Sequence, residues 1–404
     1  MPKKIYRASD YGKNEEDLIR NFNTQLDDAK LYFINCIKPR LDRSYKLYIA
    51  DNRDRAKEIK KWQANISVPY IHAVVETLKP RILDARPDFT VRGRTQEDQP
   101  RSERLQSLTN YNWEIAKADD MSELVTTSAL VYGTGYMQVY WKRDVRKHKF
   151  LVTKDLNKKT LKWEEREQIF YDAPFVEWTD NYALWYDWHN VAEESKQFWF
   201  KRLVLSEEEI KRRYPAADKV RLEMAFNSGD KELIDYASVR NEVKLTHEKI
   251  TKGATSTTSG ATTQIYESSE NLQKKMHEVF EWLRPFEDSY SVMVNKVPIF
   301  KNAEMPNPYD FKESFFIGIP YLRLPGEYEG YGLPMILENP AIMLNMIKNQ
   351  RLDAATLNIH KMWIVNPLAN IKKDELVARP FGIIYSTDPN GAREIQMSDI
   401  KPSA

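Results

Sequence analysis

The stretch EYEGYGLP, Glu327–Pro334, decides the fold, because it joins a glycine-rich turn to the longest helical pattern in the chain. Pro340 suits the first turn of a helix and Asn339 can cap it, so we expect a helix from Pro340 to Ile359. Pro334 can open an earlier turn in the same way, and two proline starts predict a kink or a break. The helix would be about 30 Å long at about 1.5 Å per residue, the length of a strut.

This predicted helix has two kinds of face. Its apolar residues recur at helical spacing: Ala341, Leu344, Ile347, Leu352, Ala355 and Ile359. A separate stripe is polar and contains Asn345, Asn349, Asp353 and Thr356, with Lys348 and Arg351 beside it. We therefore expect the apolar side to be buried and the polar side to face water.

The composition is that of a folded protein with dense but balanced charge. The 404 residues are 42% hydrophobic and 12% aromatic, enough to fill the cores of two or three packed units. The 61 Lys and Arg residues are balanced by 59 Asp and Glu, so a net charge of +2 gives no global signature of nucleic-acid binding. Any contact with DNA must therefore be local.

Targeting and redox signals are weak. Cys36 is the single cysteine, which excludes an internal disulfide and a zinc site with several thiolates. No run of about 18 apolar residues predicts a membrane span. Met1–Arg7 is basic but no apolar segment follows it, so we expect the protein to be made in the cytoplasm without a signal peptide.

The N-terminal third is predicted to be helical. Asn14–Ala50 should form two helices that separate at Pro39, and Trp62–Val68 should be extended. Asp120, with Glu123 three residues later, is the expected cap of a later helix. One face of the first helical region is apolar: Leu18, Phe22, Leu26, Ala29, Phe33 and Ile37. Further helices are expected at Pro69–Leu83, with a bend at Pro80, and at Arg101–Ala118 and Met121–Val131.

From Tyr136 the apolar period changes to two, which predicts strands. Ser206 and Glu209 form a capping-box pattern for a short helix that Pro215 closes. Thr251–Gln264 is rich in Thr, Ser and Gly and is interpreted as a flexible insertion. The strands are expected at Tyr136–Trp141, Phe150–Thr153, Lys162–Phe170, His277–Leu283, Ser289–Val294, Val297–Lys301 and Ser314–Leu322, with turns at Asp155–Lys158 and Asn295–Lys296. Helices and strands together predict an α+β fold.

The search for catalytic motifs finds none with suitable spacing. The six histidines are scattered singly, and Gly330 and Gly332 lack the third glycine of a dinucleotide fingerprint. Asp88 with the Glu242-Val243-Lys244 run resembles a metal-nuclease set, but more than 150 residues separate them. We expect no enzyme activity, no cofactor and no metal site, with a metal-dependent DNA-processing enzyme as the rival class.

Two segments have the composition for contact with nucleic acid. Lys142–Lys149 is a basic run that would attract phosphates, or it is a solvated hairpin tip. Leu184–His189 is an aromatic block that could stack on bases, or it belongs to a core or a subunit interface.

An ordered series of motifs resembles the portal proteins of tailed bacteriophages, the rings through which DNA enters and leaves the capsid. The motifs are WQANISVP at Trp62–Pro69, RPDFTV at Arg86–Val91, ALVYGTGY at Ala129–Tyr136, the run Asp187–Tyr214, and GYGLP at Gly330–Pro334. Their order and spacing, more than any one motif, carry the resemblance, which covers most of the chain.

The resemblance implies a portal-like α+β architecture. Residues 1–60 would be the N-terminal helical region of a wing, 61–333 the mixed-sheet wing with the insertion near 251–264, 334–360 the stem helix, and 361–404 a small α/β clip. Portal proteins continue into a second stem helix, a tunnel loop and a crown. We therefore expect the chain recorded to Ala404 to be a truncated portal sequence.

The resemblance also implies function and partners. The chain would form a homo-oligomeric ring of twelve subunits at the capsid vertex of the virion, assembled in the cytoplasm of a host bacterium. It would bind terminase, head-tail adaptor and tail proteins, and the major capsid or scaffolding protein, and it would pass double-stranded DNA without sequence specificity. No membrane is expected to take part. Another head or tail connector protein is a further alternative.

The resemblance assigns site residues along the last third of the chain. Lys348 and Arg351 would face the DNA channel. Docking of the motor and adaptors would involve Lys372, Lys373, Asp374 and Glu375. The wing–stem joint would be formed by Gly330, Gly332 and Pro334, where glycine can take backbone angles that other residues resist.

Overall fold

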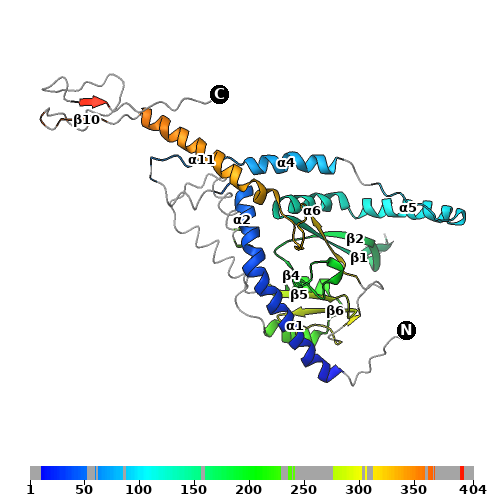
Figure 1. Cartoon of the computed structure of the whole chain (residues 1–404). Coiled ribbons are helices and arrows are strands. Elements are labelled where there is room, and N and C mark those ends of the chain that lie inside the picture. Colours follow the sequence, from blue (N-terminus) through cyan, green and yellow to red (C-terminus); the bar gives the residue numbers. More distant parts are fainter. Residues whose placement is uncertain are drawn as a thin grey trace. The chain divides into compact units, whose positions relative to one another are not determined.

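The computed structural model describes residues 11–51, 60, 62–84, 88–155, 160–228, 235–238, 240–241, 276–302, 305–306, 313–359, 363–366, 368 and 392–394. The chain combines helices with antiparallel sheets (Figure 1), so the predicted α+β class is confirmed. Contacts divide it into two compact units. Unit 1 contains Met1–Lys46 and Val74–Met335, and unit 2 contains Leu47–Ala73 and Ile336–Ala404. The predicted wing, stem and clip boundaries stay predictions.

The first helical region has the apolar face that the sequence predicted. Helix α1, Tyr11–Tyr32, continues through a π-helical turn, Phe33–Ile37, into α2, Lys38–Tyr48. The separation expected at Pro39 is therefore a wide turn, in which the N–H of Lys38 bonds the carbonyl of Phe33. Because proline has no N–H and crowds the carbonyl four residues back, a wider turn relieves the clash without ending the helix. All six predicted face residues are buried: Leu18, Phe22, Leu26, Ala29, Phe33 and Ile37.

The larger sheet of unit 1 lies between helices. Its order is β3-β4-β5-β6-β7, with β8 paired to β6. Phe22 of α1 packs edge-on against Phe200 and Trp282 with ring centroids 5.6 and 5.5 Å apart. On the alternate residues, Val279 joins a cluster with α7 and α8, and alternate residues of a strand point to opposite faces. The bounds are β3 Leu184–Tyr186, β4 Trp199–Ser206, α7 Glu207–Arg213, α8 Lys219–Asn227, β5 Met276–Arg284, β6 Ser289–Val294, β7 Val297–Pro298 and β8 Met305–Pro306.

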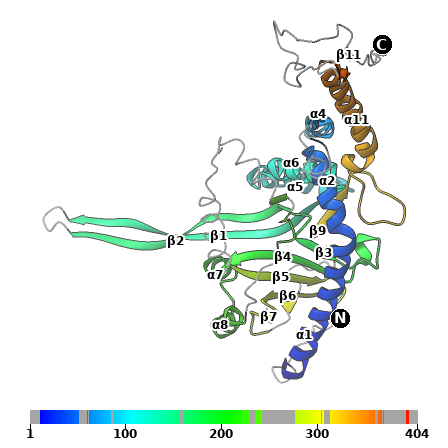
Figure 2. The ribbon, with the colours of Figure 1, turned by 90° about the vertical axis from the view of Figure 1, so that its left-hand side faces the viewer.

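The second sheet is built on a long hairpin. Strands β1, Thr134–Asp155, and β2, Thr160–Thr179, pair over almost their whole length, and β9, Phe316–Pro320, pairs with the start of β1. Figure 2 shows the distal half of the hairpin leading away from the sheets of unit 1. The strands expected at Phe150–Thr153 and Lys162–Phe170 are parts of this one hairpin. Residues 156–158 of the predicted turn lie outside the described residues.

Local capping rules were partly successful. Ser206 and Glu209 form the predicted capping box at α7, with Ser206 Oγ accepting from the Glu209 N–H at 3.4 Å. The predicted cap at Asp120 is wrong, because α6 starts earlier, at Ala118, after Lys117 in a left-handed conformation. Asn295 and Lys296 both have positive φ, as a tight hairpin turn requires. The other helices are α4 Tyr70–Leu83, which contains Pro80, η3 Gln96–Asp98, α5 Gln99–Ile115, α6 Ala118–Tyr132 and η4 Glu193–Ser195.

The long helix predicted from the C-terminal third exists and starts earlier than expected. Helix α11 runs without a break over 27 residues, Leu333–Ile359, with Pro340 inside it. The expected start at Pro340, the Asn339 cap and the break between the prolines are therefore wrong. Pro340 is the eighth residue of the helix; it removes a single N–H donor, and the helix continues on both sides of it. Strands β10, Trp363–Val365, and β11, Ala392–Glu394, pair beyond it.

Candidate functional site

In unit 2, the polar stripe of α11 holds an extended stretch of main chain. The N–H groups of alternate residues donate to the stripe: Val68 to Asn345 Oδ1 at 2.9 Å, Ile66 to Asn349 Oδ1 at 2.8 Å and Ala64 to Asp353 Oδ1 at 2.5 Å. Residues 64–68 therefore lie antiparallel to α11. We call the three accepting side chains, Asn345, Asn349 and Asp353, the amide stripe.

The spacing of the two chains explains the match. Four residues of α-helix rise about 6 Å, and two residues of extended chain span about 6.6 Å. Each Asn or Asp one turn along α11 therefore meets the next outward N–H of the extended segment. Asn349 also donates from Nδ2 to the carbonyl of Ile66 at 2.9 Å, so its amide pairs with the main chain as a strand neighbour would.

The prediction that the polar stripe of α11 faces water is thus wrong. Asn349 is 0% exposed, and Thr356 bonds back to the carbonyl of Leu352. The reason is physical: main-chain N–H groups need partners, and the stripe supplies them by becoming buried. The extended conformation predicted for Trp62–Val68 agrees with this alternate pattern.

The apolar side of α11 also departs from the prediction. Leu344 is 48% exposed and Ile347 is 36% exposed, whereas Ala341 is buried. Further large apolar side chains on the helix are exposed: Ile336, Ile342, Met343 and Met346. Within the described part of one chain, α11 therefore buries Asn349, half-buries Asn345 and Asp353 against the extended segment, and exposes an apolar face.

The same device occurs a second time, in unit 1. Phe89 donates its N–H to Asn110 Oδ1 and Val91 donates to Gln106 Oε1, both at 3.2 Å. Asn110 and Gln106 stand one turn apart on α5, again antiparallel to the extended segment. Two of the motifs that the sequence singled out, WQANISVP and the described part of RPDFTV, are therefore extended segments held by helix amides.

The motifs ALVYGTGY and GYGLP meet at Gly133, Gly330 and Gly332, which we call the glycine joint. A Cβ on Gly133 would lie 2.1 Å from the carbonyl oxygen of Gly330, and a Cβ on Gly332 would lie 2.5 Å from that of Val131. No side chain fits at these distances. Among the described glycines a positive φ is found at Gly133 and Gly326 and not at Gly330 or Gly332. The predicted reason for Gly330 and Gly332, unusual backbone angles, is therefore wrong, and close main-chain packing replaces it.

Polar contacts hold the joint from both sides. Arg40 donates to the carbonyl of Gly330 at 2.7 Å, and the N–H of Gly330 donates to Thr134 Oγ1 at 2.8 Å. Next to it, buried Glu329 accepts from the hydroxyls of Tyr136 and Tyr186, both at 2.5 Å. Pro334 lies in the first turn of α11. The role of these residues as a wing–stem joint stays a prediction.

A buried lysine beside the joint was not found from the sequence. Lys196 is 1% exposed, and its amine lies 4.2 and 4.0 Å from the ring centroids of Tyr186 and Tyr328. The amine donates to the carbonyls of Asp187 at 2.9 Å and Asn190 at 2.7 Å. Burial lowers the pKa of Lys196 to about 8, against the charges of Asp187, Glu329 and Glu193. A lone lysine in a polar loop carries no sequence signal for such burial.

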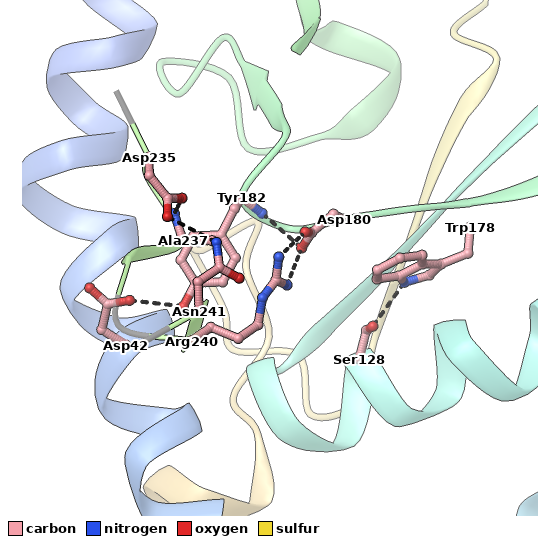
Figure 3. Close-up of polar contacts among 9 residues, drawn as sticks. All are labelled: Asp42, Ser128, Trp178, Asp180, Tyr182, Asp235, Ala237, Arg240 and Asn241. Atoms are coloured by element: carbon pink, nitrogen blue, oxygen red, sulfur yellow. Dashed lines mark hydrogen bonds and ion pairs between the residues drawn. The ribbon is translucent and has the colours of Figure 1, made fainter. Parts of the chain in front are cut away.

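A polar cluster in unit 1 fixes the residues that precede the predicted insertion. In Figure 3, Arg240 reaches Asp180 with two hydrogen bonds, at 3.0 and 2.6 Å, and the hydroxyl of Tyr182 donates to Asp42 at 2.9 Å. Asn241 donates to Asp235 at 2.9 Å, and Trp178 donates to Ser128 on α6, also at 2.9 Å. These contacts join α2, α6 and β2. Residues 251–264 lie outside the described residues.

The predicted channel and docking residues have different outcomes. Lys348 and Arg351 are exposed on α11, and their contact with DNA stays a prediction. Lys372, Lys373, Asp374 and Glu375 lie outside the described residues.

The aromatic block belongs mainly to the core. Leu184, Trp185 and Tyr186 are buried in β3, whereas Trp188 stacks on Tyr32 of α1 with centroids 5.1 Å apart. The interpretation that this block stacks on bases is therefore wrong for Trp185 and Tyr186, because their rings are already packed against other side chains.

The basic run Lys142–Lys149 lies on β1 of the hairpin and meets acids on β2. Lys149 lies 3.4 Å from Glu165, and Arg143 lies 3.8 Å from Asp172. The run is solvated, as one of the two alternatives predicted, but it is not a hairpin tip, because β1 continues in pairing with β2 as far as Asp155.

Of the residues that resemble a metal-nuclease site, only Asp88 lies among the described residues. Asp88 accepts from Asn110 at 3.0 Å, while Glu242 and Lys244 lie outside the described residues. Among the side chains that the structure describes, no group of three or more His, Cys, Asp or Glu could hold a metal ion.

Over the described ranges, no helix has both the length and the apolar character to cross a membrane. No model of a known protein family matches the sequence, and no curated protein matches it either.

Proposed function

We propose that the chain is a subunit of a phage portal-type ring, a structural conduit for double-stranded DNA at the capsid vertex of the virion. In this role α11 lines or supports the channel as a stem helix. The protein would bind terminase during packaging and tail adaptors afterwards, and it would perform no catalysis.

One observation carries the proposal: α11 exposes an apolar face while its amide stripe is already filled. Met343, Met346 and Ile347 stand at the spacing of a single helical face and are all exposed. A contiguous apolar helix surface is typical of a protein–protein contact. Copies of the same helix, arranged around an axis, would cover this face and form the wall of a ring.

The exposed cations of α11 suit such a wall. Lys348 and Arg351 can attract phosphates without reading base sequence. Few and isolated charges would hold a moving duplex weakly, which a conduit requires. The motif order described above supports the same assignment.

Electron microscopy of negatively stained protein, together with light scattering, tests the proposal. We expect rings with a central hole, and we expect Met343→Glu with Met346→Glu to leave folded subunits that do not assemble. The matched control is Ala355→Glu, which adds charge at an exposed position of α11 that lies off the face of Met343, Met346 and Ile347, and this variant should still form rings. A compact monomer for the unaltered chain would contradict the proposal. Magnesium-dependent cleavage of DNA by the purified protein would favour the nuclease class instead.

A further inference from the structure

The distal hairpin carries an exposed patch of aromatic and basic side chains. His148 lies between Phe170, at 5.1 Å between ring centroids, and Phe150, at 6.4 Å. Arg146 lies over the ring of Phe170 at 4.8 Å and forms an ion pair with Asp144 of the same strand at 2.7 Å. Phe150 is 43% exposed and Phe170 is 47% exposed. We call these four residues the hairpin patch.

The opposite face of the ribbon differs from this patch. It exposes the smaller apolar pair Val145 and Ile169, and its bases meet acids across the strands, as in the pairs Lys149–Glu165 and Arg143–Asp172. A two-stranded ribbon is marginally stable alone, and exposed phenylalanines on it gain from burial against a partner. The hairpin patch is therefore the face of the ribbon that is best suited to a contact.

A groove of about 1210 Å³ lies in unit 1 at the base of the same hairpin. Trp141, Val191 and Ile317 provide exposed apolar walls. Arg323 is the single cation among the described residues that line it. Its carboxylates are Glu193, Glu194, Glu313 and Glu327. The groove is thus apolar with an acidic excess. Its apolar walls complement the rings of Phe150 and Phe170, and its carboxylates complement Arg146, whose charge Asp144 offsets only on one side of the guanidinium.

Strand β9, which contributes Ile317 to the groove, has an outer edge that cannot pair with a further strand. On β9, the N–H of Gly318 faces Glu193 Oε2 at 3.4 Å, and the N–H of Phe316 donates to Ser314 Oγ at 3.0 Å. Pro320 follows without an N–H. An incoming segment must therefore bind through side chains rather than through β-pairing.

The hairpin patch lies away from the groove of its own chain. Val139 and Tyr140 at the base of the hairpin line the groove, while the ribbon leads away from it (Figure 2). The patch of a second copy is not subject to this separation. Contact of a patch on one copy with a different surface on the next is heterologous, and such contacts generate rings when the rotation closes.

We propose that the hairpin patch of one copy docks in the acidic, apolar groove of the adjacent copy. This proposal rests on the proposed ring, and it specifies which surfaces of unit 1 join neighbouring copies. Nucleic acid is the less favoured partner for the patch, because acids accompany the bases along the ribbon.

Cysteine cross-linking between copies tests the docking. In a Cys36→Ala background, which removes the exposed native thiol, protein with Phe170→Cys is mixed with protein carrying Ile317→Cys. A short bismaleimide should give a covalent dimer from the mixture, and the double variant should give a ladder of higher species. The matched control replaces Ile317→Cys by Val220→Cys, an exposed site on α8, and should give no dimer. Phe150→Cys repeats the test if Phe170→Cys fails to fold.

Each outcome separates the docking from the ring. Rings seen by microscopy without the Phe170–Ile317 product, or with Phe170–Phe170 product alone, would overturn the docking and leave the ring intact. Cross-linked ladders without closed rings would support the docking and contradict the ring. Loss of duplex-DNA binding by more than about tenfold in Phe150→Ser with Phe170→Ser, without the cross-link, would assign the patch to nucleic acid and overturn the docking.

Discussion

Asn349 exchanges two hydrogen bonds with the main chain of Ile66, accepting its N–H at 2.8 Å and donating to its carbonyl at 2.9 Å. A side chain of α11 thus acts as the neighbouring strand of an extended segment. Asn345 and Asp353 repeat the acceptor half of this pairing one turn away on either side. The stripe therefore fixes the register of residues 64–68 on the helix.

Replacement of Asn349 should loosen the extended segment. In Asn349→Ala, the N–H and carbonyl of Ile66 lose their partners at a position where the helix side is buried. The cost should be about 2 kcal/mol, which corresponds to amide exchange about 30 times faster in residues 62–69. Hydrogen exchange read by mass spectrometry measures this. Unchanged exchange would show that the stripe does not hold the segment.

Two further variants calibrate that result. Gln350→Ala alters the next, exposed residue of α11 and should leave exchange in residues 62–69 unchanged. Asn110→Ala removes the corresponding contact to Phe89 in unit 1. Because that site is only partly buried, its effect on residues 88–91 should be smaller than that of Asn349→Ala.

The glycine joint should be far more sensitive to an added methyl group than a glycine that merely has a positive φ. Gly332→Ala would place Cβ 2.5 Å from the carbonyl oxygen of Val131, so the main chain must move, and we expect a loss above about 3 kcal/mol. Gly326 has φ +84° but no atom within 4 Å of an added Cβ, so Gly326→Ala should cost only about 1–2 kcal/mol from strain. Thermal unfolding followed by circular dichroism compares them. Equal losses would contradict the close-packing argument.

Lys196 should give a distinct pH dependence of stability. Its pKa falls from 10.5 to about 8 on folding, so between those values the unfolded chain binds more protons at this site. Stability from this group therefore rises with pH across that window, by up to about 1.4 kcal/mol per unit. In Lys196→Met the rise is absent, so the stability of the unaltered protein relative to the variant should grow from pH 8 to 10. Urea unfolding followed by tryptophan fluorescence measures it. A difference that is flat or shrinks with pH would contradict the lowered pKa.

The exposed cations of α11 should influence DNA and not assembly. Lys348→Glu with Arg351→Glu should leave rings intact, weaken binding to all duplex sequences alike, and reduce the dependence of binding on salt. The control, Arg104→Glu with Lys219→Glu, makes the same charge change at exposed positions of α5 and α8. Binding assays at two salt concentrations and a packaging assay measure the effects. Unchanged DNA binding and packaging would remove these residues from the channel.

Several parts of the fold followed from sequence alone because they depend on neighbours within a few residues. The apolar face from Leu18 to Ile37 is a helical repeat, and Ser206 with Glu209 is a local capping pattern. Asn295 tolerates the positive φ of a tight turn. By contrast, the separate strand signals at Tyr136–Trp141 and Phe150–Thr153 did not reveal one continuous strand β1, since the charged run Lys142–Lys149 lies between them.

What the sequence by itself determined is the existence of the long C-terminal helix, its polar stripe, and the α+β class, because periodicity and turn residues act locally. What only the tertiary structure decided is which side of that helix is buried. The segment 64–68 is far from Asn349 in sequence, and its unpaired N–H groups draw the amides inward, since an unmet main-chain donor costs more than a buried, paired amide. The tertiary structure also decides why residue 332 must be glycine: a side chain there would collide with the main chain of Val131, some 200 residues earlier in the sequence.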